Sequence, residues 1–149
     1  MKIVLQRVSR ASVTVDSAIV GSIDKGYVIL LGFGAGDTRA GVEKAVEKIR
    51  KLRIFPDKNG KTNLSIADVD GEILVVSQFT LYADCTGGNR PSFVDAASPA
   101  LAEALYDHFL ECAKGKFKKV GHGVFGAKMQ VELVNDGPFT IILSEGMKI

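Results

Sequence analysis

The sequence lacks a hydrophobic run long enough to cross a membrane. Its apolar stretch at residues 27–33 is far shorter than the roughly 20 residues that a spanning helix needs. At the N-terminus, Gln6, Arg7 and Arg10 interrupt the apolar residues, a pattern that argues against a signal peptide. We therefore expect a cytoplasmic protein that has no membrane partner.

Cysteine and histidine are also scarce. The chain has two of each, and they show none of the paired spacings that a structural zinc site requires. His108 and Cys112 lie four residues apart on an expected helix and could supply two ligands to a metal, but a free thiol packed near a helix face is far commoner. We expect no metal and no cofactor, and no disulfide in a cytoplasmic chain.

A large excess of charge of one sign is missing as well. The formal net charge is +2 with a pI near 8.5, which falls short of a dedicated nucleic-acid-binding domain. Aromatic residues make up 7% of the chain and tryptophan is absent, so basic residues are rarely interleaved with aromatics. Any contact with RNA should therefore be local, and we expect no DNA partner.

The composition that is present fits one globular domain over residues 1–149. Hydrophobic residues make up 46% and charged residues 24%, a balance that allows a chain of this length to bury its own core. No internal repeat, low-complexity tract or interdomain linker interrupts the sequence.

Hydrophobic periodicity predicts a mixture of α and β structure. An amphipathic helix is expected after Gly36, with Asp37 or Thr38 as its cap, and a second helix should begin at Ser98 and Pro99. The pattern predicts strands at 1–8, 12–15, 18–23 and 27–33, and a loose hairpin around the turn at 57–60.

One expected strand ends in a group of polar side chains. Residues 73–76 are all apolar, as in a strand buried on both faces, and Ser77, Gln78 and Thr80 follow. These hydroxyl and amide groups would lie where a core meets a cleft. From this segment alone, a strand end whose Ser77 and Thr80 satisfy nearby backbone groups remains the commoner alternative to a catalytic role.

A strong turn signal lies near the C-terminus, where Asn135, Asp136, Gly137 and Pro138 follow one another between two apolar stretches. Gly137 admits unusual backbone angles, and Pro138 fixes its own φ and removes a hydrogen-bond donor. On spacing alone, this pattern predicts a hairpin between two strands.

Together, the two segments resemble the two signature motifs of the D-aminoacyl-tRNA deacylases. The first motif corresponds to residues 77–81, and the second to residues 135–138 followed by Thr140. The resemblance covers essentially the whole chain, because it also includes Gln6, Arg7, Val8, Arg90, Pro91, Ser92, Phe93, Phe125, Gly126, Ala127 and Met129. Phe139 departs from the family, which more often carries Val there, and its larger side chain could alter pocket shape or turn packing.

The resemblance implies an α/β fold: one domain of layered, mostly antiparallel or mixed β-sheets with two main helices packed on one side. It also implies a two-fold symmetric homodimer with a cross-subunit active site. In that arrangement the Gly137–Pro138 peptide bond is cis. Only about 5–6% of X–Pro bonds in folded proteins are cis, so the sequence without the family would predict trans.

The activity implied by the resemblance is hydrolysis of the ester bond in D-aminoacyl-tRNA. The amide of Gln78 and the backbone N–H groups of Phe79 and Thr80, next to Ser77, could stabilise an oxyanion. The 2′-hydroxyl of the substrate's terminal ribose would take part in the hydrolysis. Thr80 could orient water or attack the carbonyl; the sequence favours orientation, because no histidine lies beside the motif to act as a base.

The same resemblance implies a chiral selector. The carbonyls of Gly137 and Pro138 would capture the substrate's α-amino group and leave no room for an L side chain, with Arg7 and Asn135 in the same region. Glycine has no side chain to reject, so glycyl-tRNA should be accepted to some degree. Arg7 interrupts an apolar strand and could orient carbonyls, although an edge-strand charge in solvent would look the same.

Further residues are expected to contact tRNA. Arg90 and Phe93 resemble the segment that lines the adenosine end of tRNA in the family. A lysine-rich loop at residues 114–119 could contact phosphates, although an ordinary solvated loop is equally compatible with its charge. The expected tRNA-binding residues are Arg90, Phe93, Phe125, Met129, Lys116, Lys118 and Lys119.

Two other functions remain open from the sequence. A non-catalytic RNA-binding domain would use the lysine-rich loop and the polar strand end, but the aromatic content is low for such a module. A small-molecule esterase with a threonine nucleophile would need a base that the sequence does not reveal.

Overall fold

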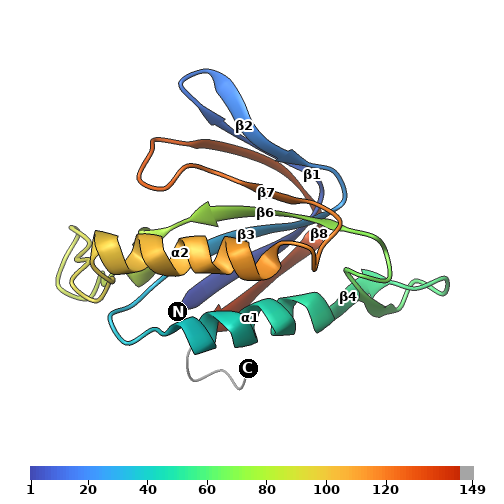
Figure 1. Cartoon of the computed structure of the whole chain (residues 1–149), viewed down its shortest axis with the longest axis horizontal. Helices are drawn as coiled ribbons and strands as arrows, with labels where there is room; N and C mark the ends of the chain where they lie inside the picture. Colours follow the sequence, from blue (N-terminus) through green and yellow to red (C-terminus); the bar gives the residue numbers. More distant parts are fainter. Residues whose placement is uncertain (145–149) are drawn as a thin grey trace.

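The computed structural model describes residues 1–144. Its strands and helices follow one another in a mixed order (Figure 1). They are β1 (Lys2–Val15), β2 (Ala18–Ile23), β3 (Gly26–Gly32), α1 (Arg39–Lys51), β4 (Arg53–Pro56), β5 (Thr62–Ser65), β6 (Glu72–Ser77), the 3-10 helix η1 (Phe79–Tyr82), α2 (Pro99–Ala113), β7 (Val120–His122) and β8 (Gln130–Ser144).

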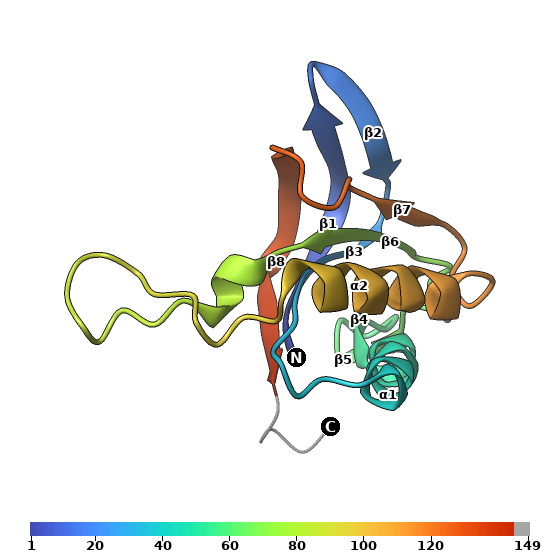
Figure 2. The same cartoon turned by 60° about the vertical axis from the view of Figure 1, so that its left-hand side comes forward.

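A mixed six-stranded sheet forms the centre of the molecule, with the order β2-β1-β3-β6-β7 and with β8 also paired to β1. The β1–β2, β1–β3 and β1–β8 pairs are antiparallel, whereas β3–β6 and β6–β7 are parallel. Both helices lie on the same side of this sheet (Figures 1 and 2). The predicted layered α/β fold is therefore confirmed.

The sheet separates two hydrophobic clusters of different size. On β3, Ile29 belongs to the larger cluster, which faces the helices, whereas Val28 belongs to the smaller one on the opposite face. On β6, Val75 and Leu74 divide in the same way. Side chains that alternate along a strand have an apolar partner on each face, which explains the uninterrupted apolar runs at these two positions.

The predictions of two helices and of a loose hairpin around residues 57–60 are confirmed. Thr38 caps α1 by accepting a hydrogen bond from the Gly41 N–H, and Ser98 caps α2 with Pro99 as its first residue. The predicted loose hairpin is the separate two-stranded sheet of β4 and β5. Within residues 1–144, no helix has both the length and the apolar character needed to cross a membrane.

Two details of the strand prediction are wrong. The strands expected at 1–8 and 12–15 form the single strand β1, and the C-terminal turn does not make a hairpin. Instead, β8 continues through Gly137 and Pro138 and pairs with β1 on both sides of them, with register shifts between Gln6 and Val8 and between Val8 and Arg10. The reason is that β1 is long enough to hold both halves of β8, so the turn residues become an irregularity within one strand.

Within residues 1–144, one buried side-chain polar atom has no hydrogen-bond partner. Tyr27 is fully buried with its ring stacked on Phe55 at a centroid distance of 5.2 Å. Among the described residues, its hydroxyl makes no hydrogen bond, and burial raises its pKa well above the usual value. The hydroxyl of Tyr106, by contrast, donates to the Val75 carbonyl at 2.9 Å.

We predict opposite effects for removal of these two hydroxyls. Tyr27→Phe should leave the free energy of unfolding unchanged or raise it by about 1 kcal/mol, because an unpaired buried hydroxyl is removed. Tyr106→Phe should lower it by about 1 kcal/mol, because the Val75 carbonyl loses its partner. Urea unfolding at matched protein concentration measures both; a clear loss of stability in Tyr27→Phe would contradict the assignment.

Candidate functional site

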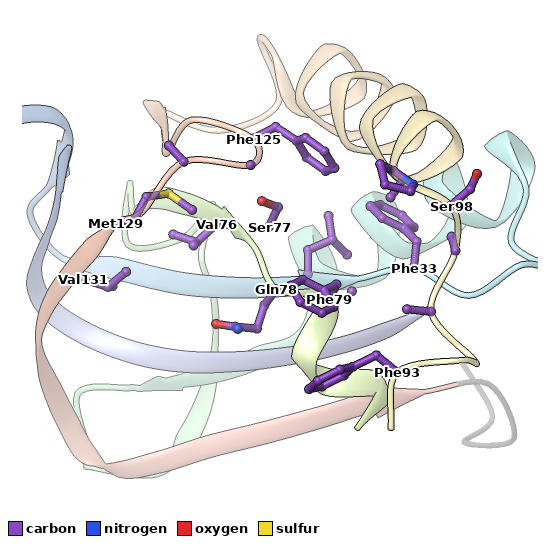
Figure 3. A pocket seen from close by; sticks show the side chains of 18 residues that line it. Phe33, Val76, Ser77, Gln78, Phe79, Phe93, Ser98, Phe125, Met129 and Val131 are labelled. Carbon is purple, nitrogen blue, oxygen red and sulfur yellow. The ribbon is translucent and has the colours of Figure 1, made fainter. Parts of the chain in front are cut away.

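A cavity of about 700 Å³ opens beside the C-terminal end of β6 (Figure 3). Strands β3 and β6, the start of α2 and the segment before β8 contribute its walls. Its lining residues are Leu31, Gly32, Phe33, Val76, Ser77, Gln78, Phe79, Phe93, Ala96, Ala97, Ser98, Pro99, Ala102, Phe125, Gly126, Ala127, Met129 and Val131. None of them has an ionisable side chain, and Ser77, Gln78 and Ser98 provide the polar side chains.

The predicted boundary between core and cleft lies at Ser77. Val76 is almost fully buried, whereas Ser77 and Gln78 are half-buried and line the cavity. The Gln78 N–H donates to the Leu31 carbonyl at 2.9 Å, which ties the segment to β3 just beyond the last residue of β6. The chain then turns into η1, so these polar groups are held at a defined edge of the sheet.

Thr80 lies on the exposed side of this turn and does not line the cavity. The side-chain amide of Gln78 donates a hydrogen bond to its hydroxyl. The amide nitrogen that makes this contact is a donor only and cannot accept the proton of the hydroxyl. The backbone N–H groups of Phe79 and Thr80 donate to no carbonyl among residues 1–144, so they are available to an oxygen atom of a ligand.

Two phenylalanines from different segments meet at the cavity. Phe79 of η1 and Phe93 of the long connection before α2 make an edge-to-face contact, with ring centroids 5.1 Å apart. Both rings are partly exposed, at 56% and 36%. They offer aromatic surface to a ligand with a flat ring. Arg90 belongs to the same connection and is exposed, but it does not line the cavity.

Phe125 and Met129 line the cavity from the segment between β7 and β8 (Figure 3). The ring of Phe125 packs on Tyr106 of α2, with centroids 5.9 Å apart. Because the Tyr106 hydroxyl is bonded to the backbone of β6, this contact links the cavity wall to the strand that presents Ser77.

The second sequence motif lies elsewhere on the chain and does not line this cavity. Gly137 and Pro138 are exposed, and the peptide bond between them is cis, as the resemblance implied. Asn135 holds the segment from within: its side-chain amide donates to the carbonyls of Arg7 (2.9 Å) and Phe139 (3.0 Å) and accepts from the Phe139 N–H.

Arg7 supports the same segment from β1. Its Nε donates to the Asp136 carbonyl at 2.9 Å, and a terminal nitrogen donates to the Ile54 carbonyl at 2.6 Å. Its guanidinium also lies 4.4 Å from the centroid of the Phe139 ring. The larger side chain at position 139 therefore packs against Arg7 and adds a cation–π contact to the hydrogen bonds.

The lysine-rich loop is not part of the cavity lining. Lys116 forms an ion pair with Glu47 (2.8 Å) and, through this hydrogen bond, holds the pKa of Glu47 below its usual value. Lys118 lies near Asp70 and Glu72. Lys116, Lys118 and Lys119 follow the C-terminal end of α2, whereas the cavity adjoins the beginning of that helix, about 22 Å away along 15 residues.

Sequence reasoning missed several cavity residues. Ser98 and Pro99 were recognised only as a helix start, although they also form part of the wall. Phe33 was treated as the end of a central strand. No motif in the sequence marks these positions, because they come together only when α2 packs beside the ends of β3 and β6.

The matching family model and two similar relatives all carry the description of a tRNA deacylase. A family model described as D-Tyr-tRNA(Tyr) deacylase matches residues 4–144. The chain is 53% identical over 143 residues to a D-aminoacyl-tRNA deacylase of Lactobacillus gasseri, covering 96% of this chain and 99% of that one. It is 52% identical over 143 residues to a D-aminoacyl-tRNA deacylase of Fervidobacterium nodosum, covering 96% of each.

Two solved structures resemble the fold. One, titled c-Myc DNA Unwinding Element Binding Protein, has a TM-score of 0.89 and 44% identity and covers 97% of this chain and 98% of its own. The other, titled as a structural analysis of a probable eukaryotic D-amino acid tRNA deacylase, has a TM-score of 0.86 at 17% identity. It covers 95% of this chain and 97% of its own, and at that identity it supports the fold alone.

Proposed function

This chain belongs to the D-Tyr-tRNA(Tyr) deacylase family, and from that premise we propose that it hydrolyses the ester bond of D-aminoacyl-tRNAs to release the D-amino acid and free tRNA. We also propose that the reaction takes place in the cytoplasm, where tRNA is aminoacylated for translation. The relatives named D-aminoacyl-tRNA deacylase support this activity, as do residues 77–81 and 135–138, which resemble the two signature motifs of that family.

The proposed mechanism rests on one observation about the cavity. Its lining has backbone N–H groups, hydroxyls and an amide, but no ionisable side chain. An aminoacyl ester is already activated toward water, so hydrolysis needs positioning and oxyanion stabilisation more than a strong base. We assign the oxyanion contact to the N–H groups of Phe79 and Thr80 and, once substrate displaces its bond to Thr80, the Gln78 amide. The substrate's 2′-hydroxyl would take part in place of a protein nucleophile.

The role of Thr80 gives a direct test of this mechanism. Thr80→Ala should keep its rate at saturating D-tyrosyl-tRNA within about tenfold of the parent, because the backbone N–H of residue 80 is unchanged. Loss of a true nucleophile costs on the order of 10⁴-fold or more. Single-turnover hydrolysis measures the chemical step, and a loss of that larger size would assign the nucleophile to Thr80.

Chiral selection is assigned to Gly137 and Pro138 of a second subunit. Within one chain, these residues lie outside the lining of the cavity that holds the first motif. Asn135 and Arg7 hold the backbone of the segment while Gly137 and Pro138 stay exposed, an arrangement that suits presentation to another molecule. If both motifs act on one substrate, a symmetric homodimer supplies them to the same site.

Exposed apolar side chains on β8 support such a dimer. Val134 and Ile142 are 40% and 57% exposed on the strand that carries Gly137 and Pro138. A partner subunit on this strand would cover them and bring its own Gly137 and Pro138 toward the facing cavity. In this arrangement the two carbonyls bind the α-amino group and exclude an L side chain, whereas glycyl-tRNA still enters.

The experiment that tests the function compares D-tyrosyl-tRNA, L-tyrosyl-tRNA and glycyl-tRNA at matched concentration, with spontaneous hydrolysis subtracted. We expect rapid loss of the D ester, measurable loss of the glycyl ester and no loss of the L ester above background. Hydrolysis of all three would retain the ester chemistry and reject the selector. Hydrolysis of none would reject the enzyme and favour a non-catalytic RNA-binding domain.

Two glycines, Gly32 and Gly36, offer a matched pair of variants that tests the position of the first motif. A Cβ added at Gly32 would lie 2.7 Å from the Gln78 carbonyl oxygen, so the backbone of the motif would have to move. A Cβ at Gly36 would meet nothing within 4 Å.

We predict that Gly32→Ala lowers kcat/KM for D-tyrosyl-tRNA by about 10² -fold, because a displacement near 1 Å is enough to misplace oxyanion donors. Gly36→Ala should leave kcat/KM unchanged. Thermal unfolding of both variants separates a displaced motif from a misfolded chain. Equal activity of the two variants would show that the position of Gln78 does not control the reaction.

The proposed tRNA contacts follow from the same cavity. Phe79, Phe93, Phe125 and Met129 would receive the terminal adenosine, and Arg90, in the same connection as Phe93, would contact the backbone of the 3′ end. The lysines at the far end of α2 would contact a more distant part of the tRNA, where Lys116 and Lys118 would first have to leave their acidic partners.

A further inference from the structure

Three side chains of types that can ligate a metal meet outside the cavity, from two helices. Glu43 belongs to α1, and His108 and Cys112 lie one turn apart on α2. The two helices lie next to each other on one side of the sheet (Figures 1 and 2). None of the three residues lines the cavity assigned to the deacylase reaction, and that reaction uses none of them.

The three donor atoms converge. His108 Nε2 lies 3.0 Å from Glu43 Oε1 and 3.5 Å from Cys112 Sγ, and all three lie within 4.8 Å of one another. In a tetrahedral zinc site with bonds of about 2.0–2.3 Å, neighbouring ligand atoms are separated by about 3.3–3.8 Å. The His108–Cys112 separation therefore matches a coordination shell, and the His108–Glu43 separation is slightly shorter than one, so small side-chain adjustments would complete the shell.

Burial of the three residues also suits a metal with one open position. The His108 side chain is 9% exposed and Cys112 is half-buried, so their donor atoms are held by the helix packing. Glu43 is 58% exposed and leaves the outer side accessible to water as a fourth ligand.

The ligand types decide which cation fits. Imidazole, thiolate and carboxylate together match Zn²⁺, whereas Mg²⁺ and Ca²⁺ prefer oxygen ligands alone.

We propose that Glu43, His108 and Cys112 form a zinc-binding site that joins α1 to α2. A cation there would hold together the two helices that cover the large hydrophobic cluster, at a distance from the reacting ester. The site would therefore act on the stability of the helix layer. A histidine–glutamate hydrogen bond with a neighbouring free thiol is the competing interpretation, and it predicts no metal binding.

The test uses the full chain after treatment with a chelator. Zn²⁺ titration by calorimetry should show one site per chain, and Mg²⁺ should show none. Glu43→Gln, His108→Gln and Cys112→Ser should each weaken Zn²⁺ binding by at least roughly tenfold, the smaller end of the loss caused by removing even an outer partner of a ligand. Cys85→Ser is the matched control, because Cys85 is exposed and remote in sequence, and it should bind Zn²⁺ normally.

Two further measurements distinguish a defined metal site from nonspecific metal binding. Co²⁺ should give tetrahedral absorption with a thiolate-to-cobalt charge-transfer band that disappears in Cys112→Ser but not in Cys85→Ser. Zn²⁺ at about 100 times its Kd should raise the unfolding midpoint by roughly 5–10 °C. Circular dichroism of the metal-free variants shows whether each one folds.

Absence of Zn²⁺ binding, or binding that none of the three substitutions weakens, would overturn the proposal. So would a loss of binding in Cys85→Ser equal to that in Cys112→Ser. Failure of these tests leaves the deacylase function untouched, because that function is measured with D-tyrosyl-tRNA and uses residues at another site.

Discussion

Burial of β3 and β6 on both faces is the constraint on which the rest of the structure depends. Their side chains alternate between the cluster under the helices and the smaller cluster on the opposite face, so the middle of β6, from Ile73 to Val76, is apolar throughout. The polar residues of β6, Glu72 and Ser77, lie at its two ends. This is why Ser77 and Gln78 stand at the edge of the cavity, and why the backbone after them is free to present N–H groups.

The long pairing of β1 with β8 imposes a second constraint. Because β1 pairs with β8 from Lys2 to Thr14, the strand has to absorb residues 135–139 as an irregularity instead of ending in a turn. Arg7 and the Asn135 side chain supply the hydrogen bonds that the irregular backbone cannot make within the ladder. The exposed Gly137 and Pro138 thus stand on a rigid support, away from the cavity of their own chain.

These constraints place different chemistry in different parts of one small domain. The cavity at the end of β6 offers hydrogen-bond donors and aromatic surface without charge, which suits an activated ester and a terminal base. The helix layer holds Glu43, His108 and Cys112 together on its own, because α1 and α2 pack against each other over the same hydrophobic cluster. The proposed metal would act on this packing, and the proposed ester hydrolysis depends on the strand end.

The sequence by itself determined the mixed α/β character, both helices with their caps, the central strands and the polar group at residues 77–80. Each of these follows from local causes: hydrophobic period, capping chemistry and the contrast between apolar and polar runs. Tertiary structure alone decided that residues 135–138 lie within one strand, that Ser98 and Phe33 join the cavity wall and that Glu43 reaches His108 across 65 residues. The physical reason is that these outcomes depend on which distant segment packs alongside, and spacing along the chain carries no information about that partner.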